Sequence, residues 1–205
     1  MKLFKILAIA AMAMVSSVSA QAGVVLSNMG TNGLTDTAGP TNSDVLGNFR
    51  FASGFTTGSV AQILDWVSIV GFNNDASQKT VAIYTDNANN PGSLFATSAP
   101  RSVGTRAVLK FNFSGVTLAA NTKYWVVPEL GLSWYQNDNG DAPTAINGSG
   151  YTHAGVRRSD DSGATWASRT QLYTLAISTS EVPEPALTSL LCLSGIALIR
   201  RRMKK

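Results

Sequence analysis

The sequence predicts an all-β protein, an antiparallel β-sandwich of jelly-roll-like form built as a single domain. Three observations predict this fold class. Apolar and polar residues alternate at a period of two over short segments, as one buried face of a sheet requires. Turns rich in Asn and Gly separate these segments at intervals of roughly 8 to 12 residues. Between residues 23 and 180 no long apolar stripe at helical spacing occurs.

Short segments of alternating or apolar residues are expected to be the strands of this domain. The candidates are 24–27, 47–55, 62–72, 79–85, 93–98, 106–113, 123–128, 132–136, 150–157 and 171–178. The clearest alternation is in 106–113, where Leu109, Phe111 and Phe113 share one face. Tyr173 and Ile177 repeat it near the end of the domain. Such strands bury one face and expose the other.

The segment 62–72 is apolar on both of its faces. A regular alternation would place Leu64 and Trp66 on one face, and Val67 and Ile69 on the other. A strand with two apolar faces is covered on both sides, so we expect this strand to be central in its sheet.

The first 22 residues have the pattern of a secretory signal peptide, expected as a helix before the domain. Lys2 and Lys5 precede an apolar stretch, and Ala20-Gln21-Ala22 fits the small-residue site of signal peptidase. We expect cleavage after Ala22, so that the exported domain spans residues 23–180. Cleavage after Ala20 is the alternative.

Residues 181–205 carry a second targeting pattern. Pro183, Glu184 and Pro185 are followed by an apolar run at 186–199 and a basic tail at 200–205. As a helix, that run would extend roughly 21 Å, which is short of a hydrocarbon core of about 30 Å. The basic tail is expected on the cytoplasmic side. An uncut C-terminal anchor remains the alternative.

This order of motif, short transmembrane helix and basic tail resembles the PEP-CTERM sorting signal of Gram-negative bacteria. The resemblance implies that an exosortase-type enzyme cleaves near Pro183, Glu184 and Pro185. The protein would then pass transiently through the inner membrane to the cell surface or the extracellular matrix. Proteins with this signal typically accompany an exopolysaccharide or a biofilm.

Three further segments resemble the choice-of-anchor R domain. They are residues 82–94, which include Tyr84 and Pro91, residues 118–127, which include Tyr124 and Trp125, and Gly163-Ala164-Thr165-Trp166. The resemblance covers most of residues 24–178. It implies attachment to a surface and brings no catalytic or ligand-binding residues with it.

Charge and cysteine content exclude several classes of function. The chain carries 16 Lys and Arg residues and 12 Asp and Glu residues, but seven of the basic residues lie in the two terminal segments. Residues 23–182 hold nine basic and eleven acidic residues, a net charge of −2, so the sequence gives no support for a nucleic-acid partner. Cys192 lies in the C-terminal segment, so the domain is expected to fold without a disulfide.

We expect no enzyme activity, no cofactor and no metal site. None of the common nucleophile, zinc-protease or P-loop motifs is present, and His153, the single histidine, cannot assemble a zinc site. The Asn- and Asp-rich loops at 86–90 and 137–141 do not follow the calcium-binding EF-hand spacing. Asp65 is the most suggestive acidic residue. A carboxylate pair for glycoside hydrolysis leaves no short motif, so a polysaccharide hydrolase stays open as a further alternative.

The candidate glycan contacts are Trp134, Asp138 and Asp141. An exposed ring can stack on a sugar face, while nearby carboxylates bind hydroxyl groups. Only Trp134 or its neighbour Tyr135 can face such a site, because adjacent strand residues point to opposite sides. Packing in the core is the alternative for these rings.

The sequence therefore predicts an exported surface or matrix protein with a structural or adhesive role. A carbohydrate-binding module is the alternative reading, and exopolysaccharide is then the expected partner.

Overall fold

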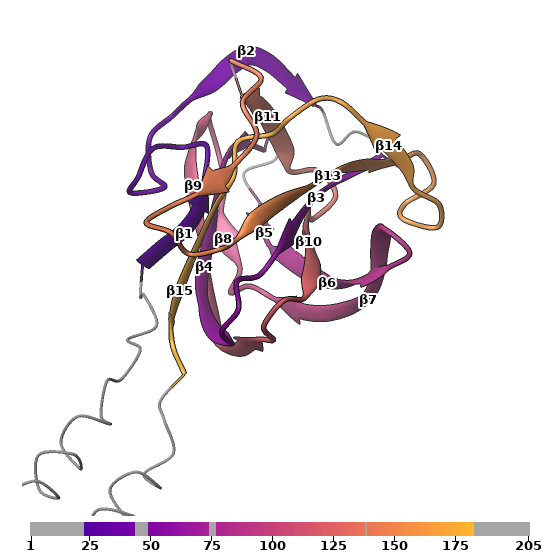
Figure 1. Ribbon diagram of the computed structural model, residues 1–205. Helices are drawn as coiled ribbons and strands as arrows, with labels where there is room; N and C mark the ends of the chain where they lie inside the picture. The colour runs from indigo at the N-terminus through magenta and orange to yellow at the C-terminus, as the bar shows by residue number, and fades with distance from the viewer. Residues whose placement is uncertain (1–22, 44–48, 74–76, 138, 183–205) are drawn as a thin grey trace, which may run out of the picture.

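The computed structural model of this chain describes residues 23–43, 49–73, 77–137 and 139–182 (Figure 1). Within these residues the chain forms strands, turns and irregular loops, and every strand pairing is antiparallel. No helix of the described part has the length and apolar character of a membrane span. The predicted cleavage at Ala22, the Pro183-Glu184-Pro185 motif and the two terminal helices lie outside the described residues.

The larger of the two main sheets, here called sheet A, has seven strands. Its order is β12 (Thr144–Ala145), β1 (Gly23–Ser27), β15 (Ala176–Glu181), β4 (Gln62–Phe72), β11 (Ser133–Asn137) and β2 (Ala38–Ser43), and β9 (Ala107–Leu118) also pairs with β4. Gly23 pairs with Thr179. The two ends of the described domain therefore lie side by side.

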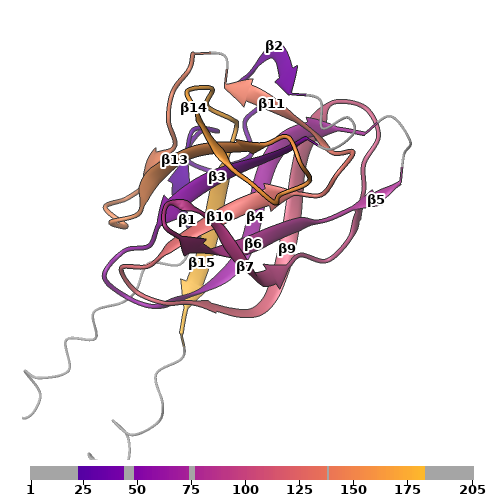
Figure 2. The ribbon, with the colours of Figure 1, turned by 90° about the vertical axis from the view of Figure 1, so that its right-hand side faces the viewer.

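The second main sheet, sheet B, has six strands. Its order is β14 (Ala167–Arg169), β13 (Thr152–Ser159), β3 (Arg50–Thr56), β10 (Lys123–Pro128), β6 (Val81–Asn87) and β7 (Asn90–Thr97). Figure 2 views the molecule from the side of β7 and β14. A small third sheet joins β5 (Gln78–Lys79) to β8 (Arg101–Ser102). Successive long strands alternate between sheets A and B at most connections.

Each of the ten predicted strand segments overlaps a strand of the structure. The last begins at Ala176 instead of residue 171, because Tyr173 joins Gln136 only through an isolated bridge. The sequence did not predict β2, β5, β8, β12 and β14. These strands are short or lack apolar alternation, so their pairing depends on neighbours that are distant in the chain.

The expectation that 62–72 is a central strand is confirmed. β4 pairs along most of its length with β9, while its other edge pairs with β15 and then with β11. The predicted faces of β4 were wrong at its start, because the register shifts between Leu64 and Trp66 against both β9 and β15. Such a bulge inserts one extra residue. Leu64 consequently joins Val67 and Ile69 in the main core, and Trp66 packs on the outer side of sheet A.

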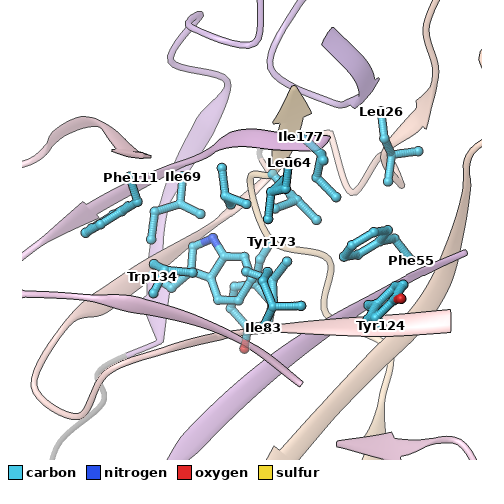
Figure 3. Packing of buried hydrophobic residues seen from close by; sticks show 14 of the residues in the cluster. Leu26, Phe55, Leu64, Ile69, Ile83, Phe111, Tyr124, Trp134, Tyr173 and Ile177 are labelled. Atoms are coloured by element: carbon cyan, nitrogen blue, oxygen red, sulfur yellow. The ribbon is translucent and has the colours of Figure 1, made fainter. Parts of the chain in front are cut away.

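A single large cluster of buried side chains joins sheets A and B (Figure 3). Sheet A contributes Leu64, Ile69 and Phe111, among others, and sheet B contributes Phe55 and Ile83. Each large apolar side chain buried in this way stabilises the fold by about 1.5 to 3 kcal/mol. The predicted alternation of 106–113 and of 171–178 is confirmed, because Leu109, Phe111 and Phe113, and likewise Tyr173, Leu175 and Ile177, belong to this cluster or pack against it.

Smaller apolar clusters cover the outer faces of both sheets. On sheet A, Val70 and Ala176 pack with Met29, while on sheet B, Ala52 packs with Trp125 and Val127. The outer face of sheet B is therefore partly apolar, and it carries the aromatic residues from which the candidate site is built.

Candidate functional site

Trp134, the predicted sugar-stacking ring, does not lie at the surface. It is fully buried, its indole Nε1 donates a hydrogen bond of 2.7 Å to the Thr174 carbonyl, and its ring lies 4.9 Å from that of Tyr173 (Figure 3). The alternation of β11 turns Trp134 towards the core and Tyr135 outward. The prediction of a glycan contact at Trp134 is therefore wrong, and core packing is the outcome.

The outward-facing Tyr135 does not offer an open stacking surface either. The guanidinium carbon of Arg106 lies 4.6 Å from the centre of the Tyr135 ring, and the Phe72 ring lies 5.8 Å away. Arg106 also forms an ion pair of 2.9 Å with Asp36. Arg106 and Phe72 therefore cover the Tyr135 ring, which was the alternative to Trp134 in the predicted glycan site.

Asp141, the second predicted glycan contact, is exposed and lines a separate, open cleft of about 420 Å3. Its backbone N–H donates to the side-chain oxygen of Asn137 at 3.1 Å, and its carbonyl accepts from the Asn28 amide at 2.8 Å. The remaining lining is small and polar or aliphatic, with Thr31, Thr144 and no aromatic ring. Asp138, the third predicted contact, lies outside the described residues. The structure thus does not join Trp134 and Asp141 in one site.

A different group of aromatic and charged residues gathers on the outer face of sheet B. The register of β6 and β10 sets Tyr84 opposite Trp125, so both rings project from the same face. Trp166 contacts the same cluster from the turn before β14. We call the outward side chains Tyr84, Trp125 and Trp166, together with Lys123 and Arg157, the aromatic–cationic face.

Trp125 forms the floor of the aromatic–cationic face. Its side chain is fully buried, and its indole Nε1 donates a hydrogen bond of 2.8 Å to the Asp86 carboxylate. The Lys123 ammonium lies 4.9 Å and the Arg157 guanidinium carbon 5.4 Å from the ring centre. Cations at these distances are attracted by the negative face of an indole ring. Trp125 and Val127 project from one side of β10, and Tyr124 and Val126 project from the other, as the alternation of a regular strand requires.

Arg157 is held over this floor by the hairpin between β6 and β7. Its Nε donates to the Asn89 carbonyl at 2.8 Å and to the Asn90 side-chain oxygen at 3.1 Å. The hairpin turns through Ala88 and Asn89, which have φ angles of 49° and 65°. Two consecutive positive φ angles are typical of a type I′ turn, whose twist matches that of paired strands. The turn therefore fixes the acceptors that position Arg157.

Beside the floor lies a small cleft with a cavity volume of about 120 Å3. Its walls include the half-buried rings of Tyr84 and Trp166, the half-buried side chain of Arg50, and Pro91 and Gly163. A Cβ atom at Gly163 would lie 3.6 Å from the Trp166 ring and 3.7 Å from Arg50 Cδ. The absence of a side chain at Gly163 keeps the space between these two residues open. We call this space the Arg50 cleft.

The turn 159–165 places Trp166 at the edge of the Arg50 cleft. The Asp161 carboxylate accepts hydrogen bonds from the Thr165 hydroxyl at 2.6 Å, the Thr165 N–H at 2.8 Å and the Ser159 hydroxyl at 2.7 Å. These hydrogen bonds, those from Thr165 first, lower the pKa of Asp161 to about 2. The carboxylate is therefore ionised over the physiological range, and it ties together the turn that carries Trp166.

Asp65 and His153, the other residues considered from the sequence, lie within hydrogen-bonding distance of serine hydroxyl groups. Asp65 accepts a hydrogen bond of 2.7 Å from the Ser180 hydroxyl across the β4–β15 pair. His153 lies 3.3 Å from the Ser53 hydroxyl, and its burial lowers its pKa. In the described part of the chain, no three His, Cys, Asp or Glu residues are placed to hold a metal ion.

The two Asn- and Asp-rich loops form hydrogen-bonded turns. The Asp86 carboxylate accepts from the Asn89 N–H at 3.2 Å, and the Asn137 side-chain oxygen accepts from the Asn139 N–H at 3.1 Å. Both bonds are of the kind that Asn and Asp make in Asx-type turns. The side-chain oxygens of Asp86 and Asn137 thus accept hydrogen bonds from backbone N–H groups within their own turns.

No sequence motif marks the residues of the Arg50 cleft as a site. Part of the signal was present, because Ile83 is apolar and an inward Ile83 turns Tyr84 outward. Nothing in the sequence relates Arg50 to Trp166, which is more than one hundred residues away. No family model and no curated protein matches this chain.

Proposed function

We propose that this chain is an exported protein of the cell surface or extracellular matrix, and that its β-domain is an adhesive module that binds exopolysaccharide. The two antiparallel sheets with their shared core support a jelly-roll-like β-sandwich for residues 23–180. On this proposal a signal helix at 1–22 and a sorting helix at 181–205 flank the domain. An exosortase-type enzyme and, transiently, the inner membrane are its partners during export.

The positions of the domain ends support attachment at one side and binding at the other. Gly23 and Thr179 pair, so both terminal segments leave the domain from the same region. In Figure 1 this region, at the ends of β1 and β15, lies on the left, while β7 and β14 lie on the right. A domain tethered through either end can therefore turn its aromatic–cationic face away from the attachment point.

The single observation that carries the binding proposal is the Arg50 cleft, with two half-buried aromatic rings and a cation around one opening. Aromatic faces pack on the C–H-rich faces of sugar rings, and a few polar groups then fix the orientation. The cleft of Asp141 is larger but has no aromatic wall. The geometry therefore favours the outer face of sheet B as the adhesive surface.

The contacts of the carboxylates near the cleft support a binding role without hydrolysis. Asp86 accepts the indole N–H of Trp125 and pairs with Lys123 at 3.8 Å, and Asp161 closes the turn that carries Trp166. The Asp86 and Asp161 carboxylates thus position the side chains of the aromatic–cationic face. A glycosidase needs one carboxylic acid and one carboxylate facing the same sugar bond.

The adhesive role is tested by retention of the purified full chain on exopolysaccharide from the organism that produces it. Trp166→Ala is expected to reduce retention, because it removes one wall of the cleft. The matched control is Trp66→Ala, which removes a half-buried tryptophan on the outer side of sheet A that also lies under a cation, Lys110 at 4.8 Å. Equal retention of wild type and the folded Trp166→Ala variant would overturn the adhesive role of sheet B.

Export and sorting are tested independently by mass spectrometry of the protein recovered from cells. The expected chain begins at Gly23 and ends near Pro183. Recovery from the cytosol of a chain that keeps both Met1 and Lys205 would contradict the export proposal while leaving the binding test unaffected.

A further inference from the structure

Arg50 has a side-chain N–H group that donates no hydrogen bond within the described residues. Its Nε is buried and has no hydrogen-bond partner among the described residues, and no described carboxylate forms an ion pair with it. Two other cations of sheet B have acidic partners, since Lys123 pairs with Asp86 and Arg158 pairs with Asp160 at 2.5 Å. Arg50, whose side chain lines the cleft, therefore carries a buried N–H group without an acceptor.

An unpaired, partly buried guanidinium is unfavourable for a free protein. In Arg50 the buried Nε–H has lost contact with water and gains no compensating acceptor, while the half-buried side chain lines the cleft. A ligand that supplies an anionic acceptor recovers this loss. A guanidinium presents several N–H donors in one plane, so a planar carboxylate matches it through two parallel hydrogen bonds.

The surroundings of Arg50 indicate what carries this carboxylate. The rings of Tyr84 and Trp166 line the same cleft, and such rings pack against the flat, C–H-rich side of a sugar. The cavity volume of about 120 Å3 is on the scale of one sugar unit, and the rest of a polymer would lie outside the opening.

Arg157 lies next to the cleft, because it contacts Asn90, the residue before Pro91. Its hydrogen-bond acceptors among the described residues are neutral carbonyl and hydroxyl oxygens. In this region the four cations Arg50, Lys123, Arg157 and Arg158 outnumber the three carboxylates Asp86, Asp160 and Asp161 by one, whereas residues 23–182 as a whole carry −2. Arg50 and Arg157 form no ion pair with a described carboxylate, so they are the cations open to an anionic ligand.

We propose that the Arg50 cleft binds a carboxylated sugar, a uronic-acid unit of an acidic polysaccharide, with the carboxylate on Arg50 and the sugar ring against Tyr84 and Trp166. This inference rests on the proposed adhesive function and names the ligand class of that surface. It assigns different tasks to the residues of the cleft: Arg50 selects for charge, and the two rings supply contact with any sugar.

The test measures binding of the full chain, purified in detergent, to a polyuronate and to the same polymer with its carboxylates methyl-esterified. Wild type is expected to bind the free acid at least about tenfold more tightly, the effect of one lost charged contact. Arg50→Gln is expected to remove this preference and to leave weak binding of the esterified polymer. Trp166→Ala is expected to weaken binding of both polymers.

The matched control is Arg169→Gln, which removes the same charge from an exposed position on β14 that does not line the cleft. If Arg169→Gln reduces the preference as strongly as Arg50→Gln, binding follows overall charge and the proposal fails. Equally tight, Arg50-dependent binding of a sulfated dextran would overturn the assignment to carboxylates.

The test also separates this inference from the adhesive function. If Trp166→Ala weakens binding while Arg50→Gln keeps the full preference for the acid, the surface is adhesive but Arg50 is not its anion receptor. If neither change affects binding by the folded variants, the adhesive role of sheet B fails as well.

Discussion

A Cβ atom added at Gly54 would lie 2.9 Å from Cζ3 of Trp125, so the indole rests directly on the backbone of β3. The ring cannot easily move away, because its N–H is bound to Asp86. The close approach of Gly54 and Trp125 allows the floor of the aromatic–cationic face to lie flat across two neighbouring strands.

Gly54→Ala is therefore expected to lower the free energy of unfolding by about 1 to 3 kcal/mol, as overpacking generally does. Urea unfolding of the purified full chain measures the change. The control is Gly104→Ala, where an added Cβ has no neighbour within 4 Å. Its effect is expected to stay within about 0.5 kcal/mol. Equal losses for both variants would argue against close packing at Gly54.

Trp134→Ala is expected to destabilise the protein by about 3 to 5 kcal/mol, because it leaves a large cavity in the core. Thermal or urea unfolding checks this value. Retention on polysaccharide, corrected for the folded fraction, is expected to remain at the wild-type level. A selective loss of binding by a folded, stable Trp134→Ala variant would restore the sugar-contact hypothesis for this ring.

Stability is expected to fall as the pH decreases below about 6.5, the ordinary pKa of histidine. Burial lowers the pKa of His153 in the folded protein, so the unfolded chain binds a proton more readily and acid favours unfolding. Urea unfolding at several pH values between 7.5 and 5 measures the slope. His153→Gln is expected to reduce that slope, and an unchanged slope would assign the pH dependence to other groups.

Asp161→Ala is expected to loosen the turn 159–165 and to weaken ligand binding in the Arg50 cleft, because it removes three hydrogen bonds that position Trp166. Limited proteolysis and titration with polyuronate measure the two effects. Asp160→Ala is the control, since Asp160 is exposed and pairs only with Arg158 among the described residues. Faster cleavage in the Asp160 variant than in the Asp161 variant would contradict the assignment.

The same turn has a predictable response to acid. The pKa of Asp161 is lowered from 3.8 to about 2, so its ionised form is favoured by the folded turn. This contribution is fully present above pH 3.8 and is lost as the pH falls through 2. Tryptophan fluorescence of the wild type is expected to change in that window, and the part due to Trp166 is expected to be absent in Asp161→Ala.

The amino-acid sequence by itself determined the class of the fold and the position of its main strands. A period of two in segments such as Leu109, Phe111 and Phe113 is a local property, and burying the apolar side of each segment requires sheets. Apolar residues on both faces of 62–72 likewise determined that β4 is central.

Only the tertiary structure decided which aromatic residue faces which way and which residues meet. Alternation separates Trp134 from Tyr135 but does not say which side is the core, and a bulge at Asp65 reverses the faces that a regular strand would have. The Arg50 cleft joins Arg50 of β3, Tyr84 of β6 and Trp166 of the turn before β14. Their proximity depends on strand order and register, which arise from pairings between distant parts of the chain.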